Sequence, residues 1–330
     1  MTAVQTERST ALDVRGLRVE FDGGDAGPLV AVRDVSLDVG AGRLLGLVGE
    51  SGCGKSTTLL AMVGLLSGAA TISGAVRLAG QELFTADQQA LRRARGVGIA
   101  LVLQASMSTL NPVRKIAAQI TEPLVYHGLL GPAAARERAR ELLALMRLPA
   151  HVGEAFPHEL SGGMRQRASI AVALAPDPKV LLLDEPTTAL DVIAQARVLE
   201  LIRTVARERE IAVVLVTHDL PLVAHYCDEV AVMYGGEVVE RRPTTRWDEE
   251  PWHPYTRMLL ASTPDLLDAE LPATIPGTPP RLDQLPAGCP FVDRCDRALT
   301  ECATVRPALD PVGPEHRVAC HVVRDDGGER

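Results

Sequence analysis

The stretch Gly49-Glu50-Ser51-Gly52-Cys53-Gly54-Lys55-Ser56 decides which fold this chain can adopt. Its Gly-x-x-x-x-Gly-Lys-Ser pattern is typical of phosphate-binding loops, and it lies between an apolar strand at residues 44–48 and a helix expected over residues 57–66. Glycines let the backbone approach phosphates closely, Lys55 supplies a positive charge to them, and the Ser56 hydroxyl can bind magnesium. The sequence therefore predicts a nucleotide-binding α/β fold.

A second motif, Val180-Leu181-Leu182-Leu183-Asp184-Glu185, is an apolar strand that ends in two carboxylates. Adjacent residues at a strand end point to opposite sides, so Asp184 can face a magnesium ion while Glu185 faces a water near the γ phosphate. Taken alone, such a pair is equally consistent with a solvated strand end. Together with a phosphate loop, it favours one carboxylate for the metal and one for activating the nucleophile.

A further turn, Leu160-Ser161-Gly162-Gly163-Met164, precedes an apolar helical stretch at residues 170–174. The Ser161 hydroxyl and successive backbone N–H groups can hold an anion at the positive end of the helix dipole. The chain already has a phosphate loop for its own nucleotide. This second turn therefore predicts contact with a nucleotide that a partner chain holds.

Two polar residues follow other apolar strands of the expected sheet. Gln104 comes after the strand at residues 98–103, and His218 comes after the strand at residues 212–217. Because open α/β sheets bind ligands at the carboxyl ends of their strands, Gln104 can reach the metal or the water. By itself, a histidine in this position is more often structural, and a glutamine there is common.

The first half of the chain combines short strands with a helical insertion. Strands are expected at residues 17–21, 29–32, 36–39 and 44–48, and they predict an antiparallel β subdomain. Residues 112–148 carry apolar and charged side chains at helical spacing, which predicts an inserted helical subdomain at about residues 105–170.

The second half returns to alternating strands and helices. After residue 180 we expect a helix at residues 193–208 and a hairpin at residues 230–239 that turns at Gly235-Gly236. Strands that alternate with helices favour a mainly parallel sheet. Frequent prolines after residue 245 predict a small C-terminal domain over residues 246–330.

The composition excludes several classes of protein. A chain of 330 residues with 46% hydrophobic residues can bury a sizeable core. A formal net charge of -8 and an aromatic content of 3% argue against a partner that is nucleic acid. No signal-peptide core opens the chain, and no apolar run reaches the roughly 18 residues of a membrane span, so any membrane role is expected through another subunit.

Taken together, these motifs resemble the motif set of an ATP-binding cassette (ABC) transporter ATPase, in the right order, over about residues 11–245. The segments that carry the resemblance are the phosphate loop, Gln104, Leu160–Met164, Leu183–Pro186, Ala189–Asp191 and His218. The resemblance implies a P-loop NTPase core in which two such chains stack head to tail. Each ATP would then lie between the phosphate loop of one chain and the Ser-Gly-Gly turn of the other.

The resemblance also implies roles for individual residues. Glu185 would be the general base, His218 would contact the γ phosphate, and Gln104 would contact the metal and sense the membrane subunits. Magnesium would be bound by Ser56, Gln104 and Asp184. The residues implied in binding ATP are Phe21, Gly49 to Ser56, Thr57, Gln104, Asp184 and Asp191, and Ser161, Gly162 and Gly163 would serve the opposite ATP. Phe21 stands where the family stacks an aromatic ring on adenine, and core packing explains it nearly as well.

The C-terminal block narrows the family. His253-Pro254-Tyr255-Thr256, the segment 275–280 and the segment 288–295 resemble the tail of dipeptide and oligopeptide importer ATPases. The resemblance implies an ATPase at the cytoplasmic face of the cell membrane that powers peptide uptake. Its partners would be a second ATPase subunit, identical or related, two transmembrane permease subunits and an extracytoplasmic solute-binding protein.

Three other functions are alternatives to peptide import. An importer of nickel or another small solute is the first, because such relatives share parts of the C-terminal block. A soluble ABC protein of DNA repair or translation is disfavoured by the single cassette and the negative net charge. An exporter is disfavoured because the chain has no fused membrane domain and has an importer-like tail.

Four of the six cysteines lie close together near the C-terminus: Cys289, Cys295, Cys302 and Cys320. A cytosolic protein seldom forms structural disulfides, so this clustering favours metal or cluster binding. Thiolates suit zinc or iron–sulfur centres, and the Cys-x2-Cys knuckle of many zinc sites is absent. The resemblance to peptide-importer tails favours a [4Fe-4S] cluster that pins a small domain, with zinc and free thiols as the alternatives.

Overall fold

β1 (Thr10–Phe21) and β2 (Leu29–Gly40) open the chain in the computed structural model. The structure describes residues 10–23, 27–66, 68, 70–84, 88–104, 110–188, 190–263 and 273–325. The chain divides into two compact units. The first unit holds Met1–Asp13, Leu37–Leu44 and Ala75–Val216, and the second unit holds Val14–Ser36, Leu45–Gly74 and Thr217–Arg330.

The antiparallel β subdomain is a four-stranded sheet in the order β2-β1-β4-β5, with β4 at Ala70–Leu78 and β5 at Gln81–Glu82. Buried and more exposed residues alternate along most of β1 and β2, as expected for strands with one face on a core. The two strands expected at residues 29–32 and 36–39 are one strand, β2. That boundary was wrong because Asp34, with a φ of 50°, distorts the strand locally without ending it.

β3 (Leu44–Val48) leads into the phosphate loop, and all of its residues are buried. It pairs in parallel with β9 (Glu229–Tyr234), with Leu45 opposite Glu229 and Val48 opposite Val232. α1 (Lys55–Met62) begins inside the loop motif, and it ends before Gly64, whose φ of 61° lies outside the right-handed helical region. The predicted strand, loop and helix are therefore confirmed, with the helix starting and ending earlier than expected.

Three parallel strands form the sheet of the first unit, in the order β8-β7-β6. These strands are β6 (Ile99–Val102), β7 (Val180–Asp184) and β8 (Ala212–Val216). All residues of β7 and β8 are buried, as is usual for parallel strands that are covered on both faces. Val102 lies opposite Leu183, so the residues that follow β6 and β7 leave the sheet at the same edge.

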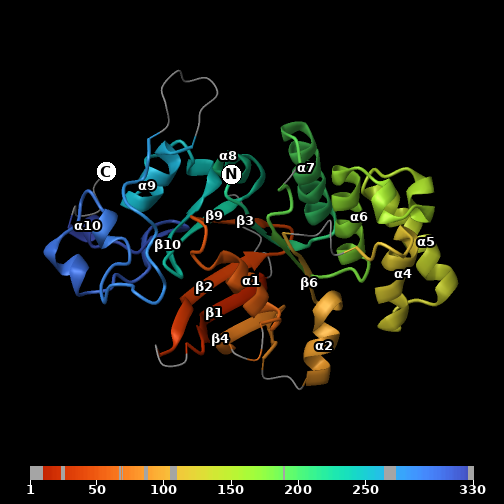
Figure 1. Ribbon diagram of the computed structural model, residues 1–330, viewed down its shortest axis with the longest axis horizontal. Coiled ribbons are helices and arrows are strands. Elements are labelled where there is room, and N and C mark those ends of the chain that lie inside the picture. The colour runs from red at the N-terminus through yellow and green to blue at the C-terminus, as the bar shows by residue number, and fades with distance from the viewer. Residues whose placement is uncertain are drawn as a thin grey trace, which may run out of the picture. The chain divides into compact units, whose positions relative to one another are not determined.

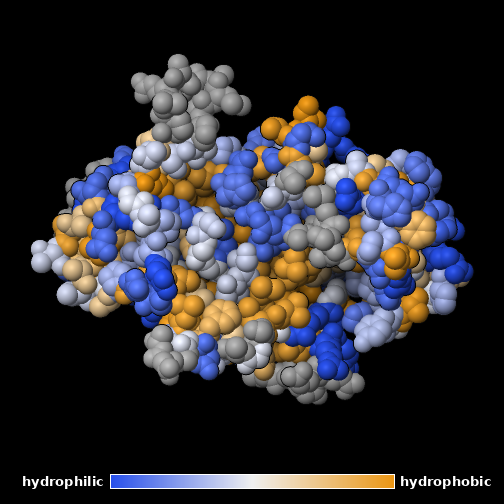
Figure 2. Space-filling view, in the orientation of Figure 1, coloured by the Kyte–Doolittle hydropathy of each residue, from blue (hydrophilic) through white to orange (hydrophobic). Residues whose placement is uncertain are grey.

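Helices α4 (Ile116–Tyr126), α5 (Pro132–Leu145) and α6 (Gly162–Leu174) pack against one another in the first unit (Figure 1). Short 3-10 turns at Ala150–Glu154 and Pro157–Glu159 connect α5 to α6. α5 buries Ala135, Ala139, Leu142 and Leu143 on one face. Figure 2 shows mostly hydrophilic side chains over these helices.

The helical character predicted for residues 112–148 is confirmed, and residues 105–109 of the expected subdomain lie outside the described residues. α2 (Gln88–Val97) also forms, which the sequence did not predict. α7 (Val192–Glu208) agrees with the helix expected at residues 193–208.

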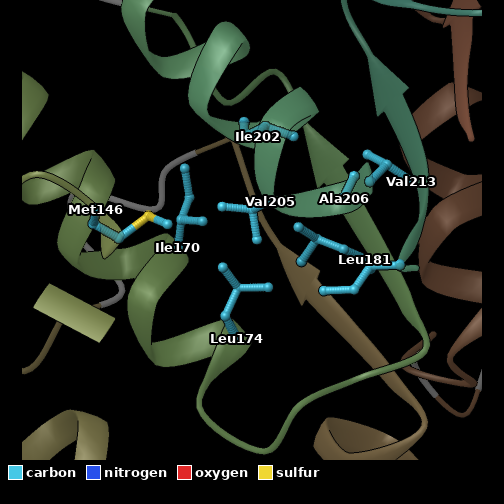
Figure 3. Close-up of a pocket in the computed structure, with 9 residues that line it drawn as sticks. Met146, Ile170, Leu174, Leu181, Ile202, Val205, Ala206 and Val213 are labelled. Carbon is cyan, nitrogen blue, oxygen red and sulfur yellow. The ribbon is translucent and has the colours of Figure 1, made fainter. Parts of the chain in front are cut away.

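The core of the first unit lies between α6, α7 and the sheet. Apolar side chains converge there on a cavity of about 10 Å³ (Figure 3). The lining residues are Met146, Ile170, Leu174, Leu181, Ile202, Val205, Ala206, Ile211 and Val213. The space is about large enough for one water molecule, but its lining offers no polar side chain, so we expect it to stay dry.

The second unit has a sheet in the order β11-β12-β10-β9-β3. β9 and β10 (Glu237–Pro243) form the expected hairpin, in which Gly235 and Gly236 take φ values of 57° and 83° that suit a tight turn. β10 pairs antiparallel with β12 (His316–Val318), which pairs with β11 (Asp310–Gly313). The separate C-terminal domain expected at residues 246–330 is not confirmed, because β12 finds its partner on the edge of β10.

The remaining elements of the second unit are short. They are α8 (Leu220–Tyr226), α9 (Pro254–Ala261), α10 (His321–Asp325) and the 3-10 turns Thr244–Arg246, Val292–Arg294 and Thr300–Ala303. Within the ranges described above, no helix combines the length and the apolar character that crossing a membrane requires.

A buried carboxylate joins β10, the start of α9 and β12. Glu240 of β10 is fully buried and accepts hydrogen bonds from the Trp252 and His253 backbone N–H groups at 3.2 and 3.1 Å and from His316 Nε2 at 2.9 Å. Burial raises the pKa of Glu240, but its polar contacts, chiefly the hydrogen bond from His316, outweigh burial and lower the pKa overall. One ionised side chain thus ties β10 to the start of α9 and to β12.

Candidate functional site

The phosphate loop folds around its own lysine. Lys55 is almost fully buried, and its Nζ donates to the carbonyl oxygens of Gly49 at 2.7 Å and Glu50 at 2.9 Å. Gly49 has a φ of 147°, and a Cβ there would lie 2.2 Å from the Met233 carbonyl oxygen, so only glycine fits. The loop therefore places an ammonium group among backbone groups, as phosphate binding requires.

The other residues predicted to bind the nucleotide from this side also belong to the second unit. Ser56 is exposed at the start of α1, and Thr57 follows it half-buried. Phe21 is the half-buried last residue of β1, which leaves both adenine stacking and core packing open. His218 is exposed, one residue before Asp219, the N-cap of α8.

The two carboxylates after β7 differ in their surroundings. Asp184 is the last residue of the strand and is buried, whereas Glu185 is half-buried and has a φ of 46°. The Glu185 N–H donates to the Val216 carbonyl oxygen at 2.9 Å, which fixes the chain at this bend. The positive φ turns the backbone out of the strand direction at Glu185, and the opposite facing of the two carboxylates stays a prediction.

Gln104 and Glu185 lie together in the first unit. Gln104 Nε2 donates to Glu185 Oε2 at 2.7 Å, and Thr188 Oγ1 donates to the same oxygen at 2.9 Å. The pairing of β6 with β7 explains why Gln104 can reach Glu185. Thr188 was not predicted as a site residue, although a hydroxyl three residues after a strand-end carboxylate is a signal for such a turn.

Ser161 and Asp191 are both N-caps of helices in the first unit. Ser161 Oγ accepts from the Met164 N–H at 3.3 Å where α6 begins, and Asp191 Oδ1 accepts from the Ala194 N–H at 2.9 Å where α7 begins. Gly162 and Gly163 form the first turn of α6, so their N–H groups lie at the positive end of its dipole. The anion site stays a prediction, and Ala189 lies outside the described residues.

The three predicted magnesium ligands fall in different compact units. Ser56 belongs to the second unit, whereas Gln104 and Asp184 belong to the first. A hydroxyl, an amide oxygen and a carboxylate are oxygen donors of the kind that Mg²⁺ prefers. The chemistry of the donor set fits the metal, and the assignment stays a prediction.

The four clustered cysteines are near enough to one another for their charges to interact. Cys289 N–H donates to the Cys302 carbonyl oxygen at 2.8 Å. Burial raises the pKa of Cys289 to about 12, and the charges of Cys302, Cys320 and Cys295 act in the same direction. All four are free cysteines.

The expected metal site among these cysteines is not confirmed. Throughout the described ranges, no group of three or more His, Cys, Asp or Glu side chains is placed to hold a metal ion. Burial raises the pKa values of Cys289, Cys295 and Cys320, so the free thiols would have to release their protons in order to bind a metal ion.

Two residues that contact the phosphate loop were missed as functional. The Glu50 N–H donates to the Tyr255 hydroxyl at 2.9 Å, and the Arg294 guanidinium pairs with the Glu50 carboxylate at 2.7 and 3.0 Å. Both residues belong to segments that carry the family resemblance, Tyr255 to residues 253–256 and Arg294 to residues 288–295. They follow Glu50 by more than two hundred positions in the chain, and no sequence pattern predicts a contact over that distance.

Three sequence families match the chain, and one of them, described as "AAA domain, putative AbiEii toxin, Type IV TA system", matches residues 153–224. The family described as "ABC transporter" matches residues 32–188, and the family described as "Oligopeptide/dipeptide transporter, C-terminal region" matches residues 239–302. The match over residues 239–302 includes Tyr255, Arg294 and three of the four clustered cysteines.

Relatives match nearly the whole chain. The oligopeptide transport ATP-binding protein OppD of Escherichia coli (strain K12) is 40% identical over 319 residues, which cover 96% of this chain and 94% of that protein. The protein of the same name from Mycobacterium tuberculosis is 44% identical over 317 residues, which cover 94% of this chain and 52% of that longer protein.

Solved structures of ATP-binding cassettes share the fold. The dimeric cassette MJ0796 in a post-hydrolysis state, bound to ADP and Pi, has a TM-score of 0.63 and 28% identity, and covers 71% of this chain and 98% of its own. cbiO1 from Clostridium perfringens, part of the transporter complex cbiONQ, has a TM-score of 0.63 and 26% identity, and covers 73% of this chain and 92% of its own.

Proposed function

The chain belongs to the ATP-binding subunits of ABC transporters that import oligopeptides, and on this premise we propose which of its residues bind and hydrolyse ATP. It is an ATPase coupled to peptide transport, with the P-loop ABC ATPase fold. The contact that carries our assignment of the chemistry is the hydrogen bond from Gln104 Nε2 to Glu185 Oε2.

The phosphate loop binds the triphosphate. Lys55 turns its ammonium from the carbonyl oxygens of Gly49 and Glu50 to the β and γ phosphates, which are stronger acceptors because they carry charge. Phe21 stacks on the adenine. Backbone N–H groups of the loop and of the residue after it surround the phosphates; they belong to Gly49, Glu50, Ser51, Gly52, Cys53, Gly54, Lys55, Ser56 and Thr57. His218 contacts the γ phosphate.

Glu185 acts as the general base. Its Oε2 accepts hydrogen bonds from Gln104 and Thr188, which fix the side chain so that the carboxylate can accept the proton of the attacking water. Ser56, Asp184 and Gln104 would hold Mg²⁺, which would supply positive charge to the phosphates. Catalysis in this arrangement depends on positioning and on electrostatic stabilisation rather than on covalent chemistry.

The Glu185→Gln variant tests this assignment. Glutamine keeps the size and the hydrogen bonds of the side chain but cannot take a proton, so ATP should still bind while hydrolysis falls about a thousandfold. ATP affinity and steady-state phosphate release measure the two effects. Unchanged turnover would remove Glu185 from the role of base.

A second ATPase subunit completes each site. Ser161, Gly162 and Gly163 present N–H groups of α6 to the γ phosphate held by the other chain, with Asp191 at the neighbouring helix start, and the two cassettes close on ATP. Ser161→Arg should preserve the chain's own ATP binding and prevent ATP-dependent dimerisation, which light scattering of the Glu185→Gln protein detects. A dimer that still forms in the Ser161→Arg variant would contradict the arrangement.

Peptide import needs further subunits. We propose that the chain lies at the cytoplasmic face of the cell membrane and drives two transmembrane permease subunits that receive peptides from an extracytoplasmic solute-binding protein. The match of residues 239–302 to the C-terminal region of oligopeptide and dipeptide transporters supports peptides over nickel or another small solute. Identification of the subunits and the solute that copurify with the chain tests this.

We also propose that Cys289, Cys295, Cys302 and Cys320 bind a [4Fe-4S] cluster. Four thiolates would supply the soft donor set that suits iron–sulfur chemistry, and the Cys289 N–H already donates to the Cys302 carbonyl oxygen at 2.8 Å. A bound cluster would pin the C-terminal segment. Iron and sulfide content with absorbance near 400 nm would support it, and stoichiometric zinc without iron would overturn it.

A further inference from the structure

The phosphate loop carries a negative charge of its own. Glu50 is the second residue of the loop, and its side chain is 21% exposed. A carboxylate next to a site for a polyanion repels the ligand, and the repulsion is strongest where water is excluded. The loop can therefore serve ATP only if the charge of Glu50 is balanced.

Arg294 supplies that balance. Its NH1 and NH2 atoms pair with the two Glu50 carboxylate oxygens at 2.7 and 3.0 Å, a bidentate geometry that is stronger than a single contact. The Arg294 side chain is only 6% exposed, so its guanidinium is shielded from water where it meets Glu50.

The guanidinium is itself fixed in place by the second unit. Nε donates to the Pro276 carbonyl oxygen at 2.7 Å, and NH1 donates to the Tyr234 hydroxyl at 3.1 Å. The guanidinium carbon lies 5.8 Å from the ring centroids of both Tyr234 and Phe291, within the range of cation–π attraction. Arg294 cannot leave Glu50 without losing these contacts.

Among the described residues, a cavity rather than packed side chains lies beside residues 50–53 at the start of the loop. A cavity of about 280 Å³ lies between Glu50–Cys53 and the segment Pro279–Leu282, so among the described residues no packed side chain fills this side. The contacts that hold the start of the loop from the C-terminal residues are the Arg294 pair and the hydrogen bond from Glu50 N–H to Tyr255.

We propose that Arg294 is a positioning residue for ATP, because it neutralises and fixes Glu50 so that the phosphate loop can accept the triphosphate. The inference rests on the proposed role of Gly49–Ser56 as the ATP site. It assigns a role in nucleotide binding to a residue of the C-terminal block, next to Cys295 in the chain, rather than to the cassette motifs alone.

The experiment measures MgATP affinity of the full-length chain with a fluorescent ATP analogue. Arg294→Gln leaves Glu50 unpaired beside the phosphates, and the dissociation constant should rise about tenfold. Adding Glu50→Ala removes the unpaired charge, so the double variant should return to within about threefold of the unchanged chain. This rescue separates the charge effect from a merely structural role of Arg294.

Arg257→Gln is the matched control. Arg257 also forms ion pairs in the C-terminal block, with Asp296 at 3.1 Å and with Glu250 at 3.5 Å. Both of these carboxylates lie outside the phosphate loop. The ATP affinity of Arg257→Gln should not change. If the unchanged chain binds no ATP, the proposed function fails; if it binds ATP and Arg294→Gln binds equally well, this inference fails.

Two further outcomes would also overturn the inference: weakening by Arg294→Gln that Glu50→Ala does not relieve, and equal weakening by Arg257→Gln. If Arg294→Gln does not fold, Arg294→Lys keeps the charge but loses the bidentate geometry. The dissociation constant of Arg294→Lys for MgATP should then rise about threefold, and adding Glu50→Ala should reverse that rise.

Discussion

The phosphate loop and the loop after β7 are positioned in opposite ways. The phosphate loop takes its outer contacts from Tyr255 and Arg294, more than two hundred residues along the chain. Glu185 is held by Thr188, three residues away, and by Gln104 at the end of the strand paired with β7. Changes in the C-terminal block should therefore alter nucleotide binding, and changes near β7 should alter the chemical step.

The largest effect that separates the two regions is expected from Glu240→Ala. It leaves the His316 side chain and two backbone N–H groups without their buried carboxylate, which should lower the free energy of unfolding by about 3 to 5 kcal/mol. Because α9 carries Tyr255, ATP affinity should fall as well. Urea denaturation measures the first effect, and Glu249→Ala, at an exposed surface pair, is the control with little expected change.

Lys55→Ala should act on the phosphate loop alone. It removes the ammonium group that meets the phosphates, and ATP affinity should fall about a hundredfold, which corresponds to about 2.7 kcal/mol. Equilibrium binding of MgATP measures it. Lys115→Ala removes a lysine from an exposed ion pair with Glu154 and should leave affinity unchanged; comparable losses in both variants would contradict the assignment.

Tyr255→Phe tests the long-range contact more gently. The ring stays, but the Glu50 N–H loses its acceptor, so the dissociation constant for ATP should rise about fivefold while the chain stays folded. Hydrogen exchange of the peptide that contains Glu50 should become faster. Tyr226→Phe, at a tyrosine of α8, is the control, and slow exchange retained in Tyr255→Phe would count against the contact.

Thr188→Val should give a change as small as that of Tyr255→Phe, but only in the chemical step. One of the two hydrogen bonds to Glu185 Oε2 is lost, which should reduce kcat about fivefold with ATP affinity unchanged. Thr204→Val, whose hydroxyl donates within α7, serves as the control. A change in affinity without a change in kcat would mean that Thr188 belongs with the binding loop.

The local features were predictable because they depend on short-range patterns. The strand before Gly49, the five buried residues of β7 and the Gly235-Gly236 hairpin followed from apolar runs and turn chemistry. The predicted break within β2 was wrong, because the amino-acid composition does not show that the chain continues as one strand through the positive φ of Asp34. The meeting of Gln104 with Glu185 was only suggested, since strand order had to be known first.

The sequence by itself determined the motifs, their order and the chemistry that each could perform, because phosphate loops, strand-end carboxylates and helix caps act through neighbouring residues. Only the tertiary structure decided that β12 extends the edge of β10, that Glu240 joins three C-terminal elements, and that Arg294 balances the charge of Glu50. Hydrogen bonds and ion pairs between distant residues depend on where the backbone brings them. No spacing along the chain encodes that placement directly.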